Sequence, residues 1–564
     1  MTSTGQIILP LELWQQITSY LTNRDIKSMR LAAKQFSSAV ELRLQRVFLS
    51  ANPLNIAVFR AVADHEKFRH QVTEIVWDDA RLPRGPLTRR ELPGWEGEMV
   101  SDEESSDNET EISRFQGSYE LDWPREDSDD EDEDEDEDGD EDEDDEGDGD
   151  PSNQLRRSTK FKSKDCPVWF KAGCAASVED AFWRHAGDDG IDGIDDEDPD
   201  YKTMRKLGSI GPPLSECWEI YRTLIRQQDD VLARKSDQEA FIHGLKRFPT
   251  LTKVTVTPAA HGFLFNPLYQ TPMIRSFPEG FNYPMPRGWP LPSHDQPEEV
   301  YSLPWKRLNE VQKEKFHGFR IVARALAKQK NNVVEFSVDS RLLRTGINCT
   351  ILDNTCEEYN HLATLLKKRG FRHLDLSFTL AGTWQSFPYE TLYDILREAG
   401  DLERLSLATT GIDAENEHKN LHNVTPMPLK DIFPIENWPK LQHFELSRLI
   451  VSESDVISFL SELPATVRSV KLSFLTFVDN RNHWHSFLAK MREEIRESRL
   501  WSDRRRNVTV GCNQEISLPG RARWIGKEVD EFLYGDGHNP FLDPPIKMPR
   551  VGYGSEKDQL DPSS

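Results

Sequence analysis

The chain has 564 residues, a mean hydropathy of −0.65 and a formal net charge of −27 at pH 7. This length allows two or three domains. The sequence contains neither the ~20-residue apolar run of a membrane helix nor a signal peptide, so we expect an intracellular protein that does not enter membranes.

Charge distribution and cysteine content argue against two further classes of protein, general nucleic-acid binders and zinc-ribbon proteins. Residues 101–150 hold 29 acidic side chains against two arginines, so this segment carries −27. The remainder is neutral, with 68 acidic (97 minus 29) and 68 basic (70 minus 2) side chains, and has no general attraction to nucleic acid. The six cysteines form no C-x-x-C pair, which argues against a zinc ribbon and favours reduced, buried thiols.

Residues 9–47 carry three apolar stripes with helical spacing, and Pro10 suits the first turn of the first helix. Three short helices can form only a small core, so part of this apolar surface must contact another domain or another protein. The stripes are Leu13, Ile17 and Leu21; Ile26, Met29 and Ala33; and Phe36, Val40, Leu44 and Val47.

The same stretch resembles the F-box, a short helical motif that binds the adaptor protein Skp1. The family pattern is L-P-x-E-[LI], then apolar residues at four-residue steps, Asp-[LI], a Leu and an aromatic residue. It is matched in order by Leu9, Pro10, Glu12, Leu13, Ile17, Leu21, Asp25, Ile26, Leu31 and Phe36. The resemblance implies an F-box domain over residues 1–50. The alternative is that the stripes pack only within this chain.

The next part of the chain is expected to change from ordered to disordered structure. "NIAVFRAVADHEKF" has helical spacing and "VTEIVWD" resembles a strand, so residues 51–95 are interpreted as a linker helix and a first repeat-like strand. Residues 96–165 are predicted to be a disordered insert. Within it, the tract 126–150 has 21 acidic residues out of 25 and no apolar side chain to offset the entropy of folding.

Strand-like segments then recur with helical segments between them. "FPTLTKVTV" (248–256) matches "WPKLQHFEL" (438–446), and similar segments begin at residues 332, 371, 402, 467 and 506. The L-x-x-L-x-L pattern with an intervening helix is typical of leucine-rich repeats, although the spacing here is irregular. We predict an α/β fold in which residues 166–534 form a degenerate leucine-rich-repeat-like arc, followed by a disordered tail over 535–564. The alternative is an ordinary α/β domain with a parallel sheet.

Residues 257–293 combine eight prolines with seven aromatic residues. This composition is too apolar for a disordered segment and too rich in proline for regular structure, so we predict an ordered loop packed over the arc. Tyr283, Arg287 and Trp289 are expected to contact a target protein, because binding hot spots favour these residue types. The alternative is a structural cap over the sheet edge.

The layout of the chain resembles a group of fungal F-box proteins with divergent repeat-like C-terminal regions. This resemblance implies a non-catalytic substrate-recognition subunit of an SCF-type ubiquitin ligase. In that family the F-box binds Skp1, and through it a cullin, while the C-terminal repeats hold the target. The alternative is an interaction protein whose acidic tract attracts basic partners such as histones. No motif predicts a catalytic residue, a metal site or a cofactor. The residues expected to bind Skp1 are Leu9, Pro10, Leu13, Ile17, Leu21 and Ile26.

Overall fold

The computed structural model describes most of the chain outside residues 86–165. The described ranges are 11–85 without 22, 33, 35 and 37–41, then 166–183, 199–286, 289, 302–340, 345–353, 356–380, 387–410, 425–478, 483–497, 500–501, 505–512 and 523–541. The predicted disordered insert and the site residues Leu9, Pro10 and Arg287 lie outside these ranges.

A mostly parallel sheet runs through the described part of the chain, which confirms the predicted α/β class. Its strands are hydrogen-bonded in the order β1-β2-β3-β4-β6-β7-β8-β10-β12-β13, with β5 beside β6. These pairs are parallel except β12 with β13, and β9 and β11 form a small separate sheet. The strands are β1 Arg46–Leu49, β2 Glu74–Asp78, β3 Lys253–Thr257, β4 Glu335–Val338, β5 Ile347–Asn348, β6 His373–Thr379, β7 Arg404–Thr409, β8 His443–Ser447, β9 Ile450–Val451, β10 Ser469–Ser473, β11 Thr476–Phe477, β12 Asn507–Cys512 and β13 Arg523–Ile525.

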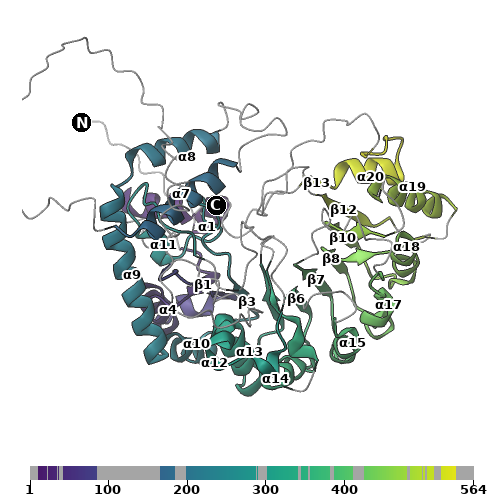
Figure 1. The fold of residues 1–564 in the computed structure, drawn as a ribbon, viewed down its shortest axis with the longest axis horizontal. Helices are drawn as coiled ribbons and strands as arrows, with labels where there is room; N and C mark the ends of the chain where they lie inside the picture. The colour runs from purple at the N-terminus through teal and green to yellow at the C-terminus, as the bar shows by residue number, and fades with distance from the viewer. Residues whose placement is uncertain are drawn as a thin grey trace, which may run out of the picture.

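Helices cover one face of this sheet. Because each parallel strand lies beside the next one in the chain, the connections return on the same side. Figure 1 shows most of the helices from α10 (Ser236–Arg247) to α18 (Glu453–Glu462) on the outer side of a curve, with the strands on its inner side. The α-helices are α1 Leu11–Ser19, α2 Asn23–Ala32, α4 Pro53–Asp64, α7 Val168–Trp183, α8 Pro199–Ile210, α9 Leu214–Arg234, α10 Ser236–Arg247, α11 Pro272–Arg275, α12 Glu310–Lys313, α13 His317–Lys328, α14 Glu357–Leu366, α15 Tyr389–Arg397, α17 Leu429–Ile432, α18 Glu453–Glu462, α19 His483–Arg496 and α20 Lys527–Tyr534.

Alternation along the strands decides which side chains enter the core. In β6, Leu374 and Leu376 are fully buried, whereas His373 and Asp375 on the other face are half-buried. The register continues the apolar rows through β7 and β8, where Leu374 is aligned with Leu405 and then with Phe444. The helix layer completes this core through apolar stripes. On α13 the stripe is Phe319, Val322, Ala323 and Leu326.

Two predicted boundaries are wrong. Val47 belongs to β1, which pairs with β2, so the stripe beginning at Phe36 does not continue as a third helix through Val47. A strand results here because pairing with the fully buried β2 satisfies the backbone of this segment. The predicted C-terminal tail also begins too early. Phe541 stacks on Trp484, and the buried Asn539 side chain donates a hydrogen bond to the His485 carbonyl.

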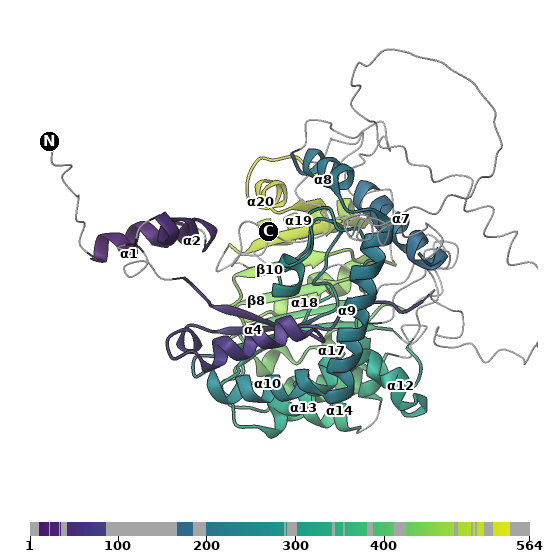
Figure 2. The same ribbon diagram turned by 90° about the vertical axis from the view of Figure 1, so that its left-hand side faces the viewer.

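The N-terminal helices α1 and α2 stand apart from the sheet and its helix layer. Figure 2 shows them beyond the end of β1, with the body of the protein on the other side. Within the described ranges, none of the helices combines the length and apolar character needed to cross a membrane.

Candidate functional site

Helix α1 presents an apolar stripe to solvent. Leu13, Ile17 and Tyr20 follow at i, i+4 and i+7, which places them on one side of a helix. Their exposed fractions are 44%, 43% and 82%, and Leu31 on α2 is 88% exposed. Among the residues that the structure describes, most large apolar side chains are buried. A group of exposed ones on two short helices therefore indicates a contact surface.

The other side of the α1–α2 unit makes a small internal core. The rings of Trp14 and Phe36 meet edge to face with centroids 5.0 Å apart, and Ile26 is 1% exposed. Asn23 ties the start of α2 to the backbone of Arg43, which precedes β1. Its side-chain amide donates to the Arg43 carbonyl at 2.7 Å, and its Oδ1 accepts from the Arg43 N–H at 3.0 Å. The unit is therefore held in shape while its apolar stripe faces outward.

The predicted Skp1-binding residues divide between these two sides. Leu13 and Ile17 are accessible, Leu21 is half-buried, and Ile26 packs inward. Leu9 and Pro10 precede the first described residue. The sequence pattern alone could not separate the two groups, because a helical stripe has the same spacing whether it faces a core or a partner.

In the proline- and aromatic-rich segment 257–293, called the aromatic loop below, two of the predicted binding residues are buried. Tyr283 is 5% exposed, and its hydroxyl lies 2.9 Å from Nδ1 of the buried His261. Trp289 is 3% exposed and donates from Nε1 to Asp79 Oδ2 at 2.8 Å. Tyr283 and Trp289 also belong to different apolar clusters. These contacts favour the structural-cap alternative for both residues.

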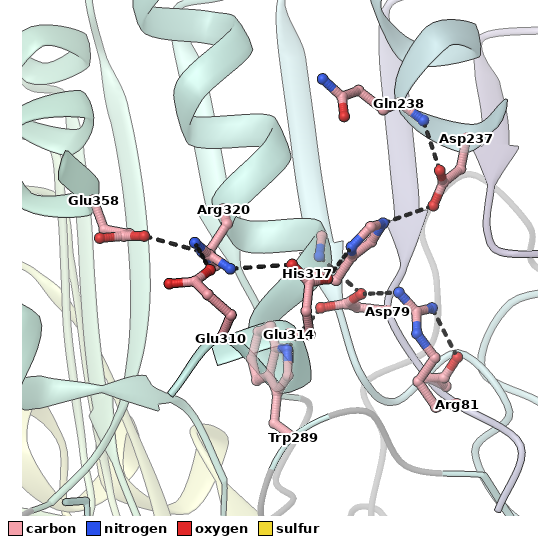
Figure 3. Close-up of polar contacts among 12 residues, drawn as sticks. Asp79, Arg81, Asp237, Gln238, Trp289, Glu310, Glu314, His317, Arg320 and Glu358 are labelled. Carbon is pink, nitrogen blue, oxygen red and sulfur yellow. Dashed lines mark hydrogen bonds and ion pairs between the residues drawn. The ribbon is translucent and has the colours of Figure 1, made fainter. Parts of the chain in front are cut away.

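Asp79 is the centre of the contacts that hold this loop (Figure 3). It directly follows β2 and is fully enclosed. Besides Trp289, its carboxylate accepts from the Gly318 N–H of α13 at 2.9 Å and from Arg81 at 3.0 Å. Burial raises the pKa of Asp79, against the opposing effect of Arg81 and His317. In the sequence, the only sign of this network was the pair Asp78-Asp79 at the end of a predicted strand. The sequence did not reveal the role of this pair.

His317 extends this network across the helix layer. Its Nε2 lies 2.8 Å from Asp237 Oδ2 and its Nδ1 lies 2.7 Å from Glu314 Oε2. Burial alone would lower its pKa, but the two carboxylates raise it to about 9. The imidazole is therefore protonated at neutral pH, with both N–H groups donating.

Arg320 connects the same network to α14. Its guanidinium bonds Glu310, Glu314 and Glu358 at 3.0 to 3.1 Å, and Glu358 also accepts from the Trp305 indole at 2.9 Å. Each charged group has a partner within the protein, as expected for a network that joins elements. We interpret it as the support of the loop.

The inner face of the sheet offers a second accessible surface. One of its register rows consists of polar side chains, namely Glu74, Lys253, Glu335, His373, Arg404 and His443 on successive strands. Opposite charges alternate along the first part of this row, with Lys253 3.0 Å from Glu74 and His373 2.9 Å from Glu335. Glu74 is buried at the β2 end of this row, whereas Arg404 is exposed and His443 is half-buried at the β7–β8 end, so this end can form hydrogen bonds to a partner.

Comparisons with protein-family models, curated proteins and solved structures gave no match. Among the residues that the structure describes, no group of three or more His, Cys, Asp or Glu side chains could hold a metal ion. The surfaces of α1–α2 and of the sheet therefore form the basis for a functional proposal.

Proposed function

We propose that this protein is a substrate-recognition adaptor of an SCF-type ubiquitin ligase. The α1–α2 unit binds Skp1, and through it a cullin, while the sheet domain holds a target protein. The observation that supports this function best is the exposed stripe of Leu13, Ile17 and Tyr20, which lies within the stretch that resembles an F-box.

The sheet domain supports the second half of the proposal. Its strands follow each other in chain order, with helices on one face and polar rows on the other. Such an arrangement is typical of repeat proteins, which use their extended inner surface for binding. We propose that it is a degenerate leucine-rich-repeat-like arc. An adaptor of this kind does no covalent chemistry. It acts by raising the local concentration of the target beside the ubiquitin-transferring enzyme.

The expected strength of the Skp1 contact follows from the exposed fractions. Complete burial of a leucine or isoleucine side chain stabilises a complex by about 1.5–3 kcal/mol. Leu13 and Ile17 have 44% and 43% left to bury, so each can contribute roughly 1 kcal/mol. Loss of both would weaken binding about tenfold or more, since about 1.4 kcal/mol corresponds to a factor of ten.

The test is co-purification of the full chain with Skp1. Leu13→Ala with Ile17→Ala should lower Skp1 recovery at least about tenfold. The matched control is Leu54→Ala with Val58→Ala, which removes two aliphatic side chains at the same spacing and similar exposure, 41% and 39%, from α4. Equal Skp1 recovery from the α1 variant and the α4 variant, with both folded by circular dichroism, would refute the proposal.

A further inference from the structure

Basic side chains gather at one edge of the helix layer, called the basic edge below, where α10, α13 and α14 end. Because the strands are parallel and each of these helices returns the chain to the start of a later strand, the helix ends meet at one edge. The exposed members of the basic edge are Lys246 near the end of α10, Arg324 and Lys328 in the second half of α13, Lys330 after α13, and Lys367 and Arg369 at the end of α14.

Hydrogen bonds between the turns make this edge one continuous surface. The Asn332 side-chain amide donates to the Pro249 carbonyl at 3.2 Å, which ties the turn after α13 to the turn after α10. Lys368 Nζ donates to the Asn331 carbonyl at 2.8 Å, which brings the end of α14 to the same turn. Helix α13 also packs against α14, and Figures 1 and 2 show α10, α13 and α14 as neighbours in this order.

The carboxylates near this edge do not neutralise it. Asp64, at the end of α4, is paired with His243 at 2.9 Å and with Arg247 at 3.4 Å, and Glu398 lies 3.8 Å from Lys367. Helix α13 itself contains no acidic residue. Within the part of the chain that the structure describes, no carboxylate forms an ion pair with four members of the edge, namely Lys246, Arg324, Lys328 and Lys330.

The helix dipoles account for only part of this positive charge. Basic residues are common at helix carboxyl ends, because each end carries about half of a negative elementary charge. The basic edge places six full positive charges at three such ends. Most of its charge is therefore available to a negatively charged ligand.

The sequence contains one segment with a matching excess of negative charge. The tract 126–150 has 21 acidic residues out of 25, whereas the chain outside residues 101–150 is neutral. The five basic residues of 156–164, next to the tract, offset only a small part of its charge. The tract is thus the ligand within this chain that is complementary to the basic edge.

The length of the chain allows this contact. The tract ends 16 positions before Cys166, and 16 extended residues span up to about 55 Å. Cys166 belongs to the same apolar cluster as Cys217 near the start of α9. Helix α9 leads to α10, and even laid end to end the two are about 50 Å long. The tract can therefore reach Lys246, and its earlier residues can reach α13 and α14.

We propose that the acidic tract 126–150 binds to the basic edge of its own chain. The contact consists of many exposed ion pairs, each of them weak and sensitive to salt. A basic partner protein has to compete with this edge for the tract. The inference depends neither on Skp1 binding nor on target binding by the sheet.

The test is chemical cross-linking of the full chain at about 0.1 M salt, where the Debye length is about 10 Å. A water-soluble carbodiimide joins carboxylates to nearby lysine amines, and mass spectrometry identifies the joined residues. We expect the tract to be joined to Lys246, Lys328, Lys330 and Lys367 about tenfold more often than to Lys527, whose side chain is 84% exposed on α20. At 1 M salt, where the Debye length is about 3 Å, these products should disappear.

A variant of the edge tests the role of its charges. Arg324→Gln with Lys328→Gln and Lys330→Gln removes half of the positive charges of the basic edge. Joining of the tract to the remaining Lys246 and Lys367 should then fall about tenfold. The matched control, Lys430→Gln with Arg496→Gln and Lys527→Gln, removes one arginine and two lysines from α17, α19 and α20 and should leave the products unchanged.

A second measurement does not depend on cross-linking. The rate of acetylation of each lysine amine is compared between the full chain and the chain without residues 101–150, with both folded by circular dichroism. Because the bound tract shields the edge, Lys328 and Lys330 should react faster after the deletion, whereas Lys527 should react at the same rate.

Several outcomes would overturn the inference. These are an even spread of products over the exposed lysines, products that persist at 1 M salt or in the edge variant, and acetylation rates that the deletion does not change. Joining confined to Lys160, Lys162 and Lys164 would show that the tract contacts only its neighbours in the chain. In a mixture of chains with and without nitrogen-15, a majority of mixed products would show that the tract binds another copy. Skp1 recovery should be the same for the edge variant, so a failure of Skp1 binding concerns α1–α2 alone.

Discussion

The protonation of His317 is expected to make the folded state depend on pH above neutrality. The imidazolium donates to Asp237 and Glu314, and its pKa is raised from 6.5 to about 9. Each pH unit of difference corresponds to about 1.4 kcal/mol, so the protonated imidazole contributes about 3 kcal/mol to folding. Asp237 is fully buried, so water does not screen the attraction between its carboxylate and the imidazolium.

The sign follows from the two states of the chain. Between pH 6.5 and about 9 the folded protein keeps a proton on His317 that the unfolded chain releases. The stabilisation is therefore complete below pH 6.5 and is lost as the pH rises through about 9. This dependence belongs to His317, and a side chain that cannot titrate removes it.

The assay is urea unfolding of the full chain, followed by tryptophan fluorescence at several pH values across this window. The free energy of unfolding of the unmodified protein minus that of His317→Gln should fall by about 3 kcal/mol as the pH rises. His361→Gln is the matched control. Burial lowers the pKa of His361, so the corresponding difference should stay constant above pH 6.5. Parallel pH profiles for the unmodified protein and His317→Gln would refute the reasoning.

Two further predictions concern the loop and the acidic segment. Trp289→Phe keeps the buried ring but removes the N–H that donates to Asp79, so the free energy of unfolding should fall by about 1.5–3 kcal/mol while the set of captured proteins stays the same. Unchanged stability together with lost targets would show instead that Trp289 belongs to the binding surface. Deletion of residues 101–150 changes the net charge from −27 to zero and should leave the melting temperature within a few degrees, because half of this segment, the tract 126–150, has no apolar side chain to add to a core. A large fall in melting temperature by calorimetry would contradict this.

Local periodicity determined the strands and helices of the sheet domain. The predicted strands at 371–377 and 402–408 correspond to β6 and β7, and the apolar residues Leu374 and Leu405 face the core as their alternation requires. These elements were predictable because a strand with one buried face shows an alternation of apolar and polar residues, which can be recognised within a few consecutive residues. The short β1 was missed, since Val47 fits helical spacing equally well and only pairing with β2 decides its structure.

Tertiary structure decided which way individual side chains point and which residues they contact. Aromatic composition suggested that Tyr283 and Trp289 bind a partner. In the structure both are buried, Tyr283 against His261 of the same loop and Trp289 against Asp79, which is 210 residues away in the chain. Spacing within a segment depends on the backbone geometry of that segment, whereas exposure and charge neighbours depend on how distant segments pack. For this reason the sequence by itself determined the α/β class and the amphipathic stripe on α1, while only the folded chain decided that Leu13 and Ile17 face outward and Ile26 inward.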